Sequence, residues 1–126
     1  MRIVTWNIQW GRGADGRVNL ARTRDLLAAL GSPELICLQE VAVDFPGLPG
    51  GPPQDGLAFL SAAFPGYEPV YTPGVDVLGE TGTGRSRFGN LLLSRLPVLQ
   101  AFRHLLPWPA EPELPSMQRA CADLLG

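Results

Sequence analysis

Apolar runs alternate along the chain with polar breaks rich in Gly and Pro, and this pattern predicts short strands and helices. Residues 2–8, rich in β-branched and aromatic side chains, and residues 35–41, a short apolar run, are typical of strands. Between them, Asn19 is expected to cap a helix and Gly31 to end it. The apolar stripe of this helix consists of Leu20, Leu26, Leu27 and Leu30. A strand, a helix and a second strand predict a right-handed βαβ unit with parallel strands.

The later part of the chain repeats this alternation with more Pro and Gly. Stretches 42–53 and 73–87 are rich in turn-forming residues and are predicted to be loops. The remaining expected elements are a helix over 54–64 with Leu57, Leu60 and Phe64 on one face, strands over 67–72, 88–94 and 117–125, and an extended segment over 98–106. The chain is therefore expected to be of the α/β class.

Length and composition limit the possibilities. At 126 residues the chain is one domain at most, and its 45% apolar content is ordinary for a globular protein. The net charge of −2 shows no overall excess of basic residues of the kind that binds nucleic acid. Nucleic acid is therefore a possible partner, but the charge of the chain does not support it. No apolar run approaches the ~18 residues that span a bilayer, and Met1 leads directly into a strand. We therefore expect a cytoplasmic protein with no membrane partner, in which Cys37 and Cys121 are buried free thiols.

Polar side chains end the first two expected strands, at Asn7 and Glu40. Ligands of parallel α/β arrangements lie outside the carboxyl ends of the strands, so the two side chains are expected to be close together. Carboxylate and amide oxygens are hard ligands that suit Mg²⁺ or Mn²⁺. From spacing alone, a solvated charge is the more common role of a strand-end Glu such as Glu40, and a strand-end hydrogen bond is the alternative for Asn7.

Four segments extend this observation across the chain: Thr5-Trp6-Asn7-Ile8, Leu38-Gln39-Glu40-Val41, residues 88–98 and Met117-Gln118-Arg119-Ala120. In this order they resemble motifs of the endonuclease/exonuclease/phosphatase superfamily, which includes deoxyribonuclease I-like nucleases and inositol-phosphate phosphatases. The resemblance implies hydrolysis of a phosphodiester or phosphomonoester with Mg²⁺ or Mn²⁺. It places Asn7 in the active site and makes Glu40 a metal ligand, and we expect Asn7 to be the second residue of the metal site. Arg119 would support catalysis, its alternative being a surface Arg, and Asn90 would hold a phosphate unless it is only a strand-edge amide.

The resemblance also implies a fold, a four-layer α/β sandwich. Residues 1–126 would be the N-terminal half of one such domain, apparently truncated, with one mixed sheet and two helices. Motifs that the superfamily uses later, of the Gly-Asp-Phe-Asn and Ser-Asp-His types, do not occur in this sequence. We therefore expect a chain that is inactive alone and that could associate with itself through an exposed apolar sheet face. The alternative is a non-catalytic remnant or interaction module.

Residues 79–86 suggest a different function, because they nearly match the phosphate-binding loop of nucleotide hydrolases. That loop needs a Lys and a helix directly after it, whereas Arg85 replaces the Lys and a strand is expected next. A nucleotide-binding function is therefore disfavoured. Arg85 and Arg87 could instead attract the phosphate of a substrate, although a mobile surface loop is the preferred interpretation. Trp6 is expected in the core and His104 in solvent.

Overall fold

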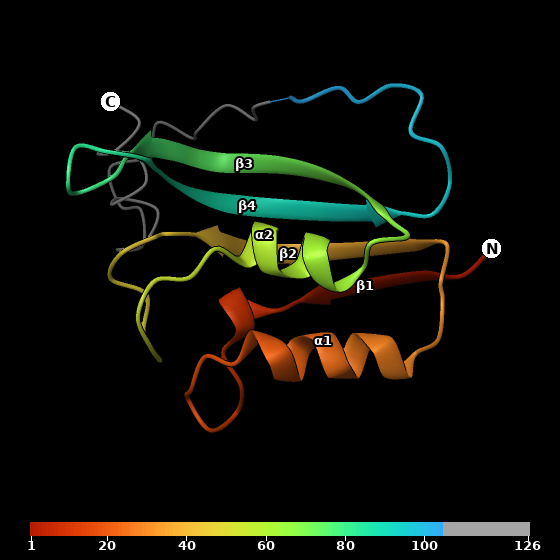
Figure 1. The fold of residues 1–126 in the computed structure, drawn as a ribbon, viewed down its shortest axis with the longest axis horizontal. Coiled ribbons are helices and arrows are strands. Elements are labelled where there is room, and N and C mark those ends of the chain that lie inside the picture. The colour runs from red at the N-terminus through yellow and green to blue at the C-terminus, as the bar shows by residue number, and fades with distance from the viewer. Residues whose placement is uncertain (105–126) are drawn as a thin grey trace, which may run out of the picture.

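The computed structural model describes residues 1–104, which form one mixed sheet with two helices. Its strands are β1 (Ile3–Asn7), β2 (Leu35–Val43), β3 (Glu68–Leu78) and β4 (Arg85–Ser94), in the spatial order β1-β2-β4-β3 (Figure 1). β1 and β2 are parallel, while β4 runs antiparallel to both of its neighbours. The predicted βαβ unit and the predicted mixed sheet are both confirmed.

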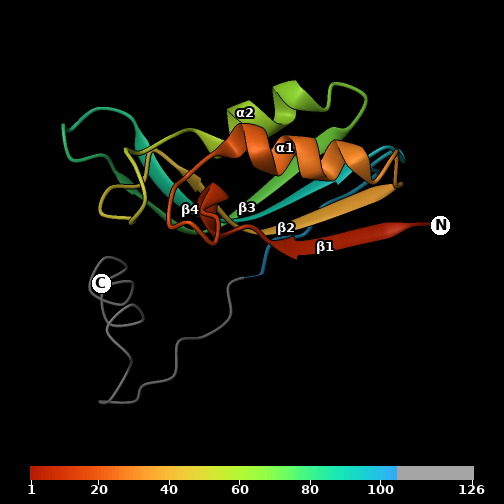
Figure 2. The same ribbon diagram turned by 90° about the horizontal axis from the view of Figure 1, so that it is seen from below.

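Both helices cover the same face of the sheet (Figure 2). Helix α1 (Leu20–Ala29) begins after Asn19, whose side chain accepts a hydrogen bond of 3.0 Å from the first turn. Helix α2 (Gly56–Ala63) begins after Asp55, which accepts a similar bond of 2.8 Å. These caps satisfy backbone N–H groups that a helix cannot satisfy itself, so they fix where each helix begins. We call the sheet face away from the two helices the open face.

The hydrophobic core lies between the sheet and the helices. Its most completely buried side chains, each less than 2% exposed, are Leu27, Ile36, Leu38, Val41, Leu60, Leu91 and Leu93. Tyr71 closes the core, and its hydroxyl donates a 2.8 Å hydrogen bond to the carbonyl of Val41. Burial raises the pKa of Tyr71 to about 12. The tyrosine therefore stays neutral in the core and keeps this bond at every ordinary pH.

The apolar stripe predicted for α1 divides into two faces. Leu20 and Leu27 are 4% and 1% exposed, and Thr23 is buried between them. Leu26 and Leu30 are instead 54% and 50% exposed. Because successive residues of a helix are turned by about 100°, Leu26 cannot share the inward direction of Leu27. The prediction that all four leucines face the core was therefore wrong for two of them.

The hairpin formed by β3 and β4 is longer than the sequence predicted. The expected loop over 73–87 consists mostly of strand, because β3 continues to Leu78 and β4 begins at Arg85. The pairing shifts between Pro73 and Val75, where β3 bulges. Since β3 is an edge strand, a proline there removes no hydrogen bond from the middle of the sheet. The Pro and Gly residues at the start of this stretch do mark an irregularity of the backbone, but it is a bulge in β3 and not a loop.

Residues 95–104 run back beside β3 without forming a strand (Figure 1). Val98 N–H donates to the carboxylate of Glu68 at 3.3 Å, and the Arg103 side chain donates to the carbonyl of Tyr71 at 3.2 Å. The extended segment predicted from residue 98 is thus an irregular cover of this sheet edge.

Three expectations concern residues outside the described range: the strand over 117–125, the thiol of Cys121 and the role of Arg119. Within it, Cys37 is a free, half-buried thiol in β2, less buried than predicted. None of the helices in residues 1–104 is long and apolar enough to cross a membrane.

Candidate functional site

The carboxyl end of β1 brings Asn7 against Glu40 of β2. The side-chain amide of Asn7 donates a hydrogen bond from Nδ2 to Oε1 of Glu40, at 3.0 Å. The expectation that these two side chains lie together is confirmed. Asn7 is exposed and Glu40 is half-buried, so the pair is accessible from solvent.

A β-bulge in β2 aims Glu40 toward this contact. The register against β4 shifts between Leu38 and Val41, so that Gln39 and Glu40 together oppose Asn90. Glu40 has a φ of +56°, which lies in the left-handed region that residues other than glycine seldom adopt. Such a conformation costs about 1–3 kcal/mol and is found most often at functional sites, where bulges redirect side chains. Here the bulge turns a carboxylate to the open face.

The loop after β1 holds the Asn7 amide in place. A short 3₁₀ segment, Gln9–Gly11, follows the strand, and the backbone N–H of Gln9 donates to Oδ1 of Asn7 at 3.1 Å. The amide oxygen thus faces Gln9, and the amide nitrogen faces Glu40. Ile8 N–H bonds to the carbonyl of Gln39 at 3.1 Å and ties this loop to β2. The orientation of Asn7 is therefore defined at both ends of its amide.

Gln39 is a structural part of the site that the sequence analysis did not select. It pairs with Asn7 across the sheet, and its amide nitrogen donates to the hydroxyl of Thr5 and to the carbonyl of Cys37, each at 3.1 Å. These bonds brace the residue that precedes Glu40. The register of β1 against β2 could have identified Gln39, because the residue opposite Asn7 in a parallel pair points to the same face of the sheet.

The donor set around Glu40 suits a hard divalent cation. Within residues 1–104, Oε2 of Glu40 accepts no hydrogen bond from the protein, and no three His, Cys, Asp or Glu side chains form a cluster. Mg²⁺ commonly binds through one or two carboxylates and takes its other ligands from water and substrate phosphate. Glu40 could therefore hold such an ion, with Asn7 as its neighbour. The roles assigned to both residues stay predictions.

Asn90 lies on β4 directly across from the bulge, with an exposed side chain. It thus shares the sheet level of Asn7 and Glu40 and could donate hydrogen bonds to an anion there. Its predicted contact with phosphate is compatible with this position and stays a prediction.

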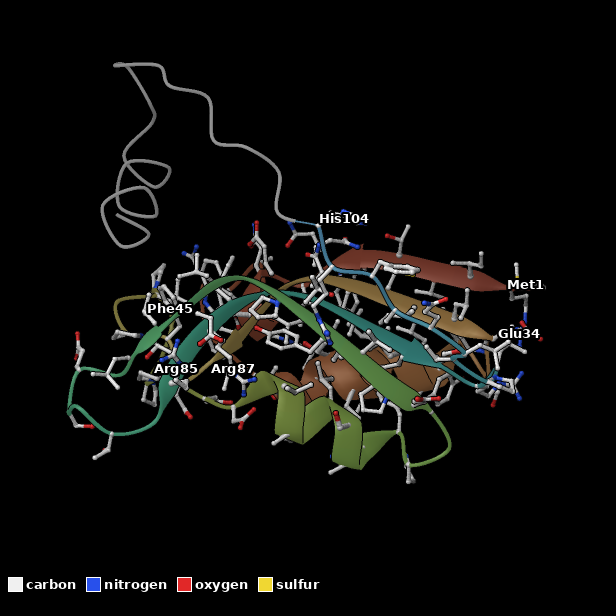
Figure 3. All side chains as sticks on the ribbon, turned by 90° about the horizontal axis from the view of Figure 1, so that it is seen from above. Met1, Glu34, Phe45, Arg85, Arg87 and His104 are labelled. Atoms are coloured by element: carbon white, nitrogen blue, oxygen red, sulfur yellow. The ribbon has the colours of Figure 1, made fainter. Side chains whose placement is uncertain are left out.

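Arg85 and Arg87 lie at the hairpin end of the sheet, on the side that carries the helices (Figure 3). Arg85 bonds to Asp76 through two nitrogens, at 2.8 Å to the carboxylate and 3.0 Å to the carbonyl. Arg87 stacks over the ring of Tyr71 at 5.5 Å. Their substrate-binding role stays a prediction, and their position does not support it, because the Asn7–Glu40 pair faces the opposite side.

The loop that resembles a nucleotide-binding motif is a hairpin turn. Gly79 N–H bonds to Gly84 O at 3.2 Å, and Gly82 N–H bonds to Gly79 O at 2.9 Å. Arg85 then begins β4, so no helix N-terminus follows to hold a phosphate. This geometry disfavours the nucleotide-binding alternative for a structural reason. The preferred interpretation of a loose surface loop was also wrong for residues 85–87, which are strand.

An ion pair shapes the polar loop between β1 and α1. Arg22 donates to both carboxylate oxygens of Asp15, at 3.0 and 3.2 Å, and to the carbonyl of Arg17 at 2.9 Å. The hydrogen bonds from Arg22 lower the pKa of Asp15 to about 2. The sequence predicted only a solvated turn here. His104 is exposed, as expected.

Comparisons with known proteins agree with this geometry. The model of the Endonuclease/Exonuclease/phosphatase family matches residues 4–123. Among solved structures, an endonuclease/exonuclease/phosphatase from Beutenbergia cavernae DSM 12333 is 30% identical with a TM-score of 0.62, over 80% of this chain and 27% of that one. The chain therefore spans 27% of the length of this relative. No curated protein matches the chain.

Proposed function

The chain belongs to the endonuclease/exonuclease/phosphatase family, and from this premise we propose that its Asn7–Glu40 pair serves the hydrolysis of a phosphate ester with Mg²⁺ or Mn²⁺. The 3.0 Å bond between the two side chains, made possible by the strained bulge at Glu40, carries this proposal. A surface carboxylate with no function does not need a left-handed backbone inside a strand.

Glu40 holds the cation in this proposal. Its Oε1 is occupied by the Asn7 amide, and its Oε2 is left for the metal. When bound, a divalent cation stabilises the negative charge that develops on the phosphoryl oxygens during hydrolysis. Because one carboxylate alone binds weakly, substrate phosphate and water complete the coordination.

Asn7 and Asn90 supply neutral donors around the phosphate. Asn7 fixes the direction of the Glu40 carboxylate, since its amide is itself held by Gln9 N–H. Asn90 presents its exposed amide from the facing strand. A neutral amide donor such as that of Asn90 can stabilise an anion without adding charge to the site.

This chain supplies the metal and phosphate side of the reaction only. Its sequence has no Gly-Asp-x-Asn or Ser-Asp-His motif, and hydrolysis of this kind needs a base that orients or deprotonates water. We therefore propose that the 126-residue chain binds the cation but does not turn over phosphoesters alone. One observation favours an interaction role in addition, namely the exposed apolar residues beside β1. A cytoplasmic location stays a prediction.

The test is a calorimetric titration with Mn²⁺ together with a phosphodiesterase assay on bis(4-nitrophenyl) phosphate. We expect Mn²⁺ to bind to the wild-type chain, and Glu40→Gln to abolish binding. Glu80→Gln, an equal loss of charge in the β3–β4 turn, is the matched control and should bind as wild type does. Unchanged binding by Glu40→Gln would contradict the proposed site. Mg²⁺-dependent turnover that Glu40→Gln removes would contradict the proposed inactivity.

A further inference from the structure

The two edges of the sheet differ in how they are protected from pairing. The outer edge of β3 has prolines at Pro69 and Pro73, a bulge, and a cover formed by residues 95–104. β1, the other edge, has no proline, charge or bulge in Ile3–Asn7, and no strand of residues 1–104 pairs with its outer side. Proteins usually protect such edges, because an unpaired apolar strand recruits another strand.

The backbone groups of β1 are directed so that they can form a complete new ladder. Arg2 O accepts hydrogen bonds from the N–H groups of Glu34 and Leu35 at the start of β2, and Ile8 N–H donates one to β2, so the even-numbered residues face that strand. Backbone groups alternate along a strand, which turns the N–H and C=O groups of Ile3, Thr5 and Asn7 outward. These outward groups lie on one line along the edge that no strand of the described residues pairs with.

Exposed apolar side chains flank the same edge. Ile3 is 54% exposed, and Trp6, predicted to lie in the core, is 36% exposed. Leu26 of α1 is 54% exposed, and Leu30, which directly follows the last residue of that helix, is 50% exposed. Trp6 and Leu26 line one hollow between β1 and α1 on the helix side of the sheet, whereas Ile3 lies on the open face, as Asn7 does. We use the name β1 edge patch for the exposed apolar side chains that flank β1 on its two faces, namely Ile3, Trp6, Leu26 and Leu30.

We propose that the β1 edge patch binds a second copy of this chain, through antiparallel pairing of β1 with β1 across a two-fold axis at Thr5. In this register Thr5 faces Thr5 of the other copy, Val4 faces Trp6, and Ile3 faces Asn7. Thr–Thr pairs and aromatic–β-branched pairs are among the cross-strand pairs that stabilise sheets. The sequence of β1 thus complements itself when it is reversed, which is the property that a two-fold interface requires.

The pairing extends one sheet through both copies. The outward N–H and C=O groups of Ile3, Thr5 and Asn7 then bond to those of the other copy. The two α1 helices lie on the same side of the joined sheet, where Leu26 and Leu30 become buried between them. The open face and the Asn7–Glu40 pair remain free, because pairing occurs in the plane of the sheet. This interface therefore differs from association through the open face and does not depend on the proposed function.

Light scattering and sedimentation of the purified full chain test the proposal. We expect wild type to have twice the mass of one chain and to dissociate on dilution. Ile3→Lys, at an exposed position, and Thr5→Pro, which removes an outward N–H, should halve that mass. Leu99→Lys, at a side chain 95% exposed and outside the β1 edge patch, is the control and should remain dimeric.

Amide hydrogen exchange provides a second measurement on variants that remain folded. In the wild-type dimer, the amides of Thr5 and Asn7 should be protected like those of Val4 and Trp6. In Ile3→Lys, the outward amides alone should lose protection. A monomeric wild type, including one whose edge pairs only with a strand of a different protein, would overturn the proposal. A dimer unaffected by Ile3→Lys and Thr5→Pro but dissociated by Leu92→Lys would also overturn it, because it would place the interface on the open face.

Discussion

The Asn7 amide donates to the Glu40 carboxylate at 3.0 Å, although 33 positions of sequence separate the two residues. Two independent features create this contact. The parallel pairing of β1 with β2 places Asn7 opposite Gln39, and the bulge then turns the next residue, Glu40, toward Asn7. The carboxylate is therefore presented by the backbone rather than by a flexible side chain on a loop.

The first prediction concerns the charge at Asn7. Asn7→Asp replaces the donor with a carboxylate beside Glu40, and two carboxylates that share a site resist double ionisation. We expect Asn7→Asp to lower the free energy of unfolding at neutral pH, as measured by urea unfolding, because the two ionised carboxylates repel each other. Asn19→Asp, at a helix N-cap where a negative charge is favourable, is the control. If Asn7→Asp were as stable as wild type at neutral pH, the two side chains would not be in contact in solution.

The second prediction concerns the backbone at Glu40. Inside a strand, Gly is normally less stable than Ala. At a φ of +56° the order should reverse, so Glu40→Gly should be more stable than Glu40→Ala by about 1 kcal/mol in urea unfolding. The same pair of substitutions at Cys37, in the regular part of β2, should show the normal order. If both positions behave alike, the bulge does not exist in solution.

The third prediction uses two adjacent leucines of α1. Leu27 is 1% exposed, so Leu27→Ala should lower the free energy of unfolding by about 2–5 kcal/mol. Leu26 is 54% exposed, and Leu26→Ala should change the stability of the monomer by only about 0.5 kcal/mol. Denaturant unfolding of the Ile3→Lys background isolates this monomer effect. Equal losses at the two positions would contradict the division of the helix into two faces.

The fourth prediction concerns acid. The pKa of Asp15 is lowered from 3.8 to about 2 by Arg22, so the folded state favours the ionised carboxylate. The resulting stabilisation is complete above pH 3.8 and is lost as the pH falls through about 2. Because the pair is partly exposed, the effect should be small and should weaken in salt. Asp15→Asn should reduce the pH dependence of unfolding in this range, as measured by urea unfolding at a series of pH values, and an unchanged pH dependence would contradict this account of the ion pair.

Local sequence signals predicted much of this structure. Asn19 and the apolar residues after it identified α1. The expected strand-end positions of Asn7 and Glu40 predicted their proximity, although β2 continues past Glu40 to Val43. Those features depend on neighbours in sequence or on the general geometry of parallel strands. The helix N-cap residues and the periodicity of the apolar positions therefore predicted most of the fold.

Features set by pairing between distant residues were not predictable in the same way. The bulge at Glu40 exists because β2 must match β4, and nothing in Leu38-Gln39-Glu40-Val41 alone indicates the extra residue. The exposure of Leu26 and Trp6 depends on where the sheet ends, since one more strand beside β1 would cover both. The position of Arg87 on the helix side likewise follows from its register with Val43.

Paramagnetic broadening by Mn²⁺ tests the metal site most directly. In a ¹⁵N-labelled wild-type chain, substoichiometric Mn²⁺ should broaden the amide signals of Asn7, Glu40 and Asn90 before all others. Glu40→Gln should abolish this pattern, while Glu80→Gln should retain it. Broadening centred on another part of the chain, or a pattern that persists in Glu40→Gln, would contradict the assignment of Glu40 as the residue that holds the cation.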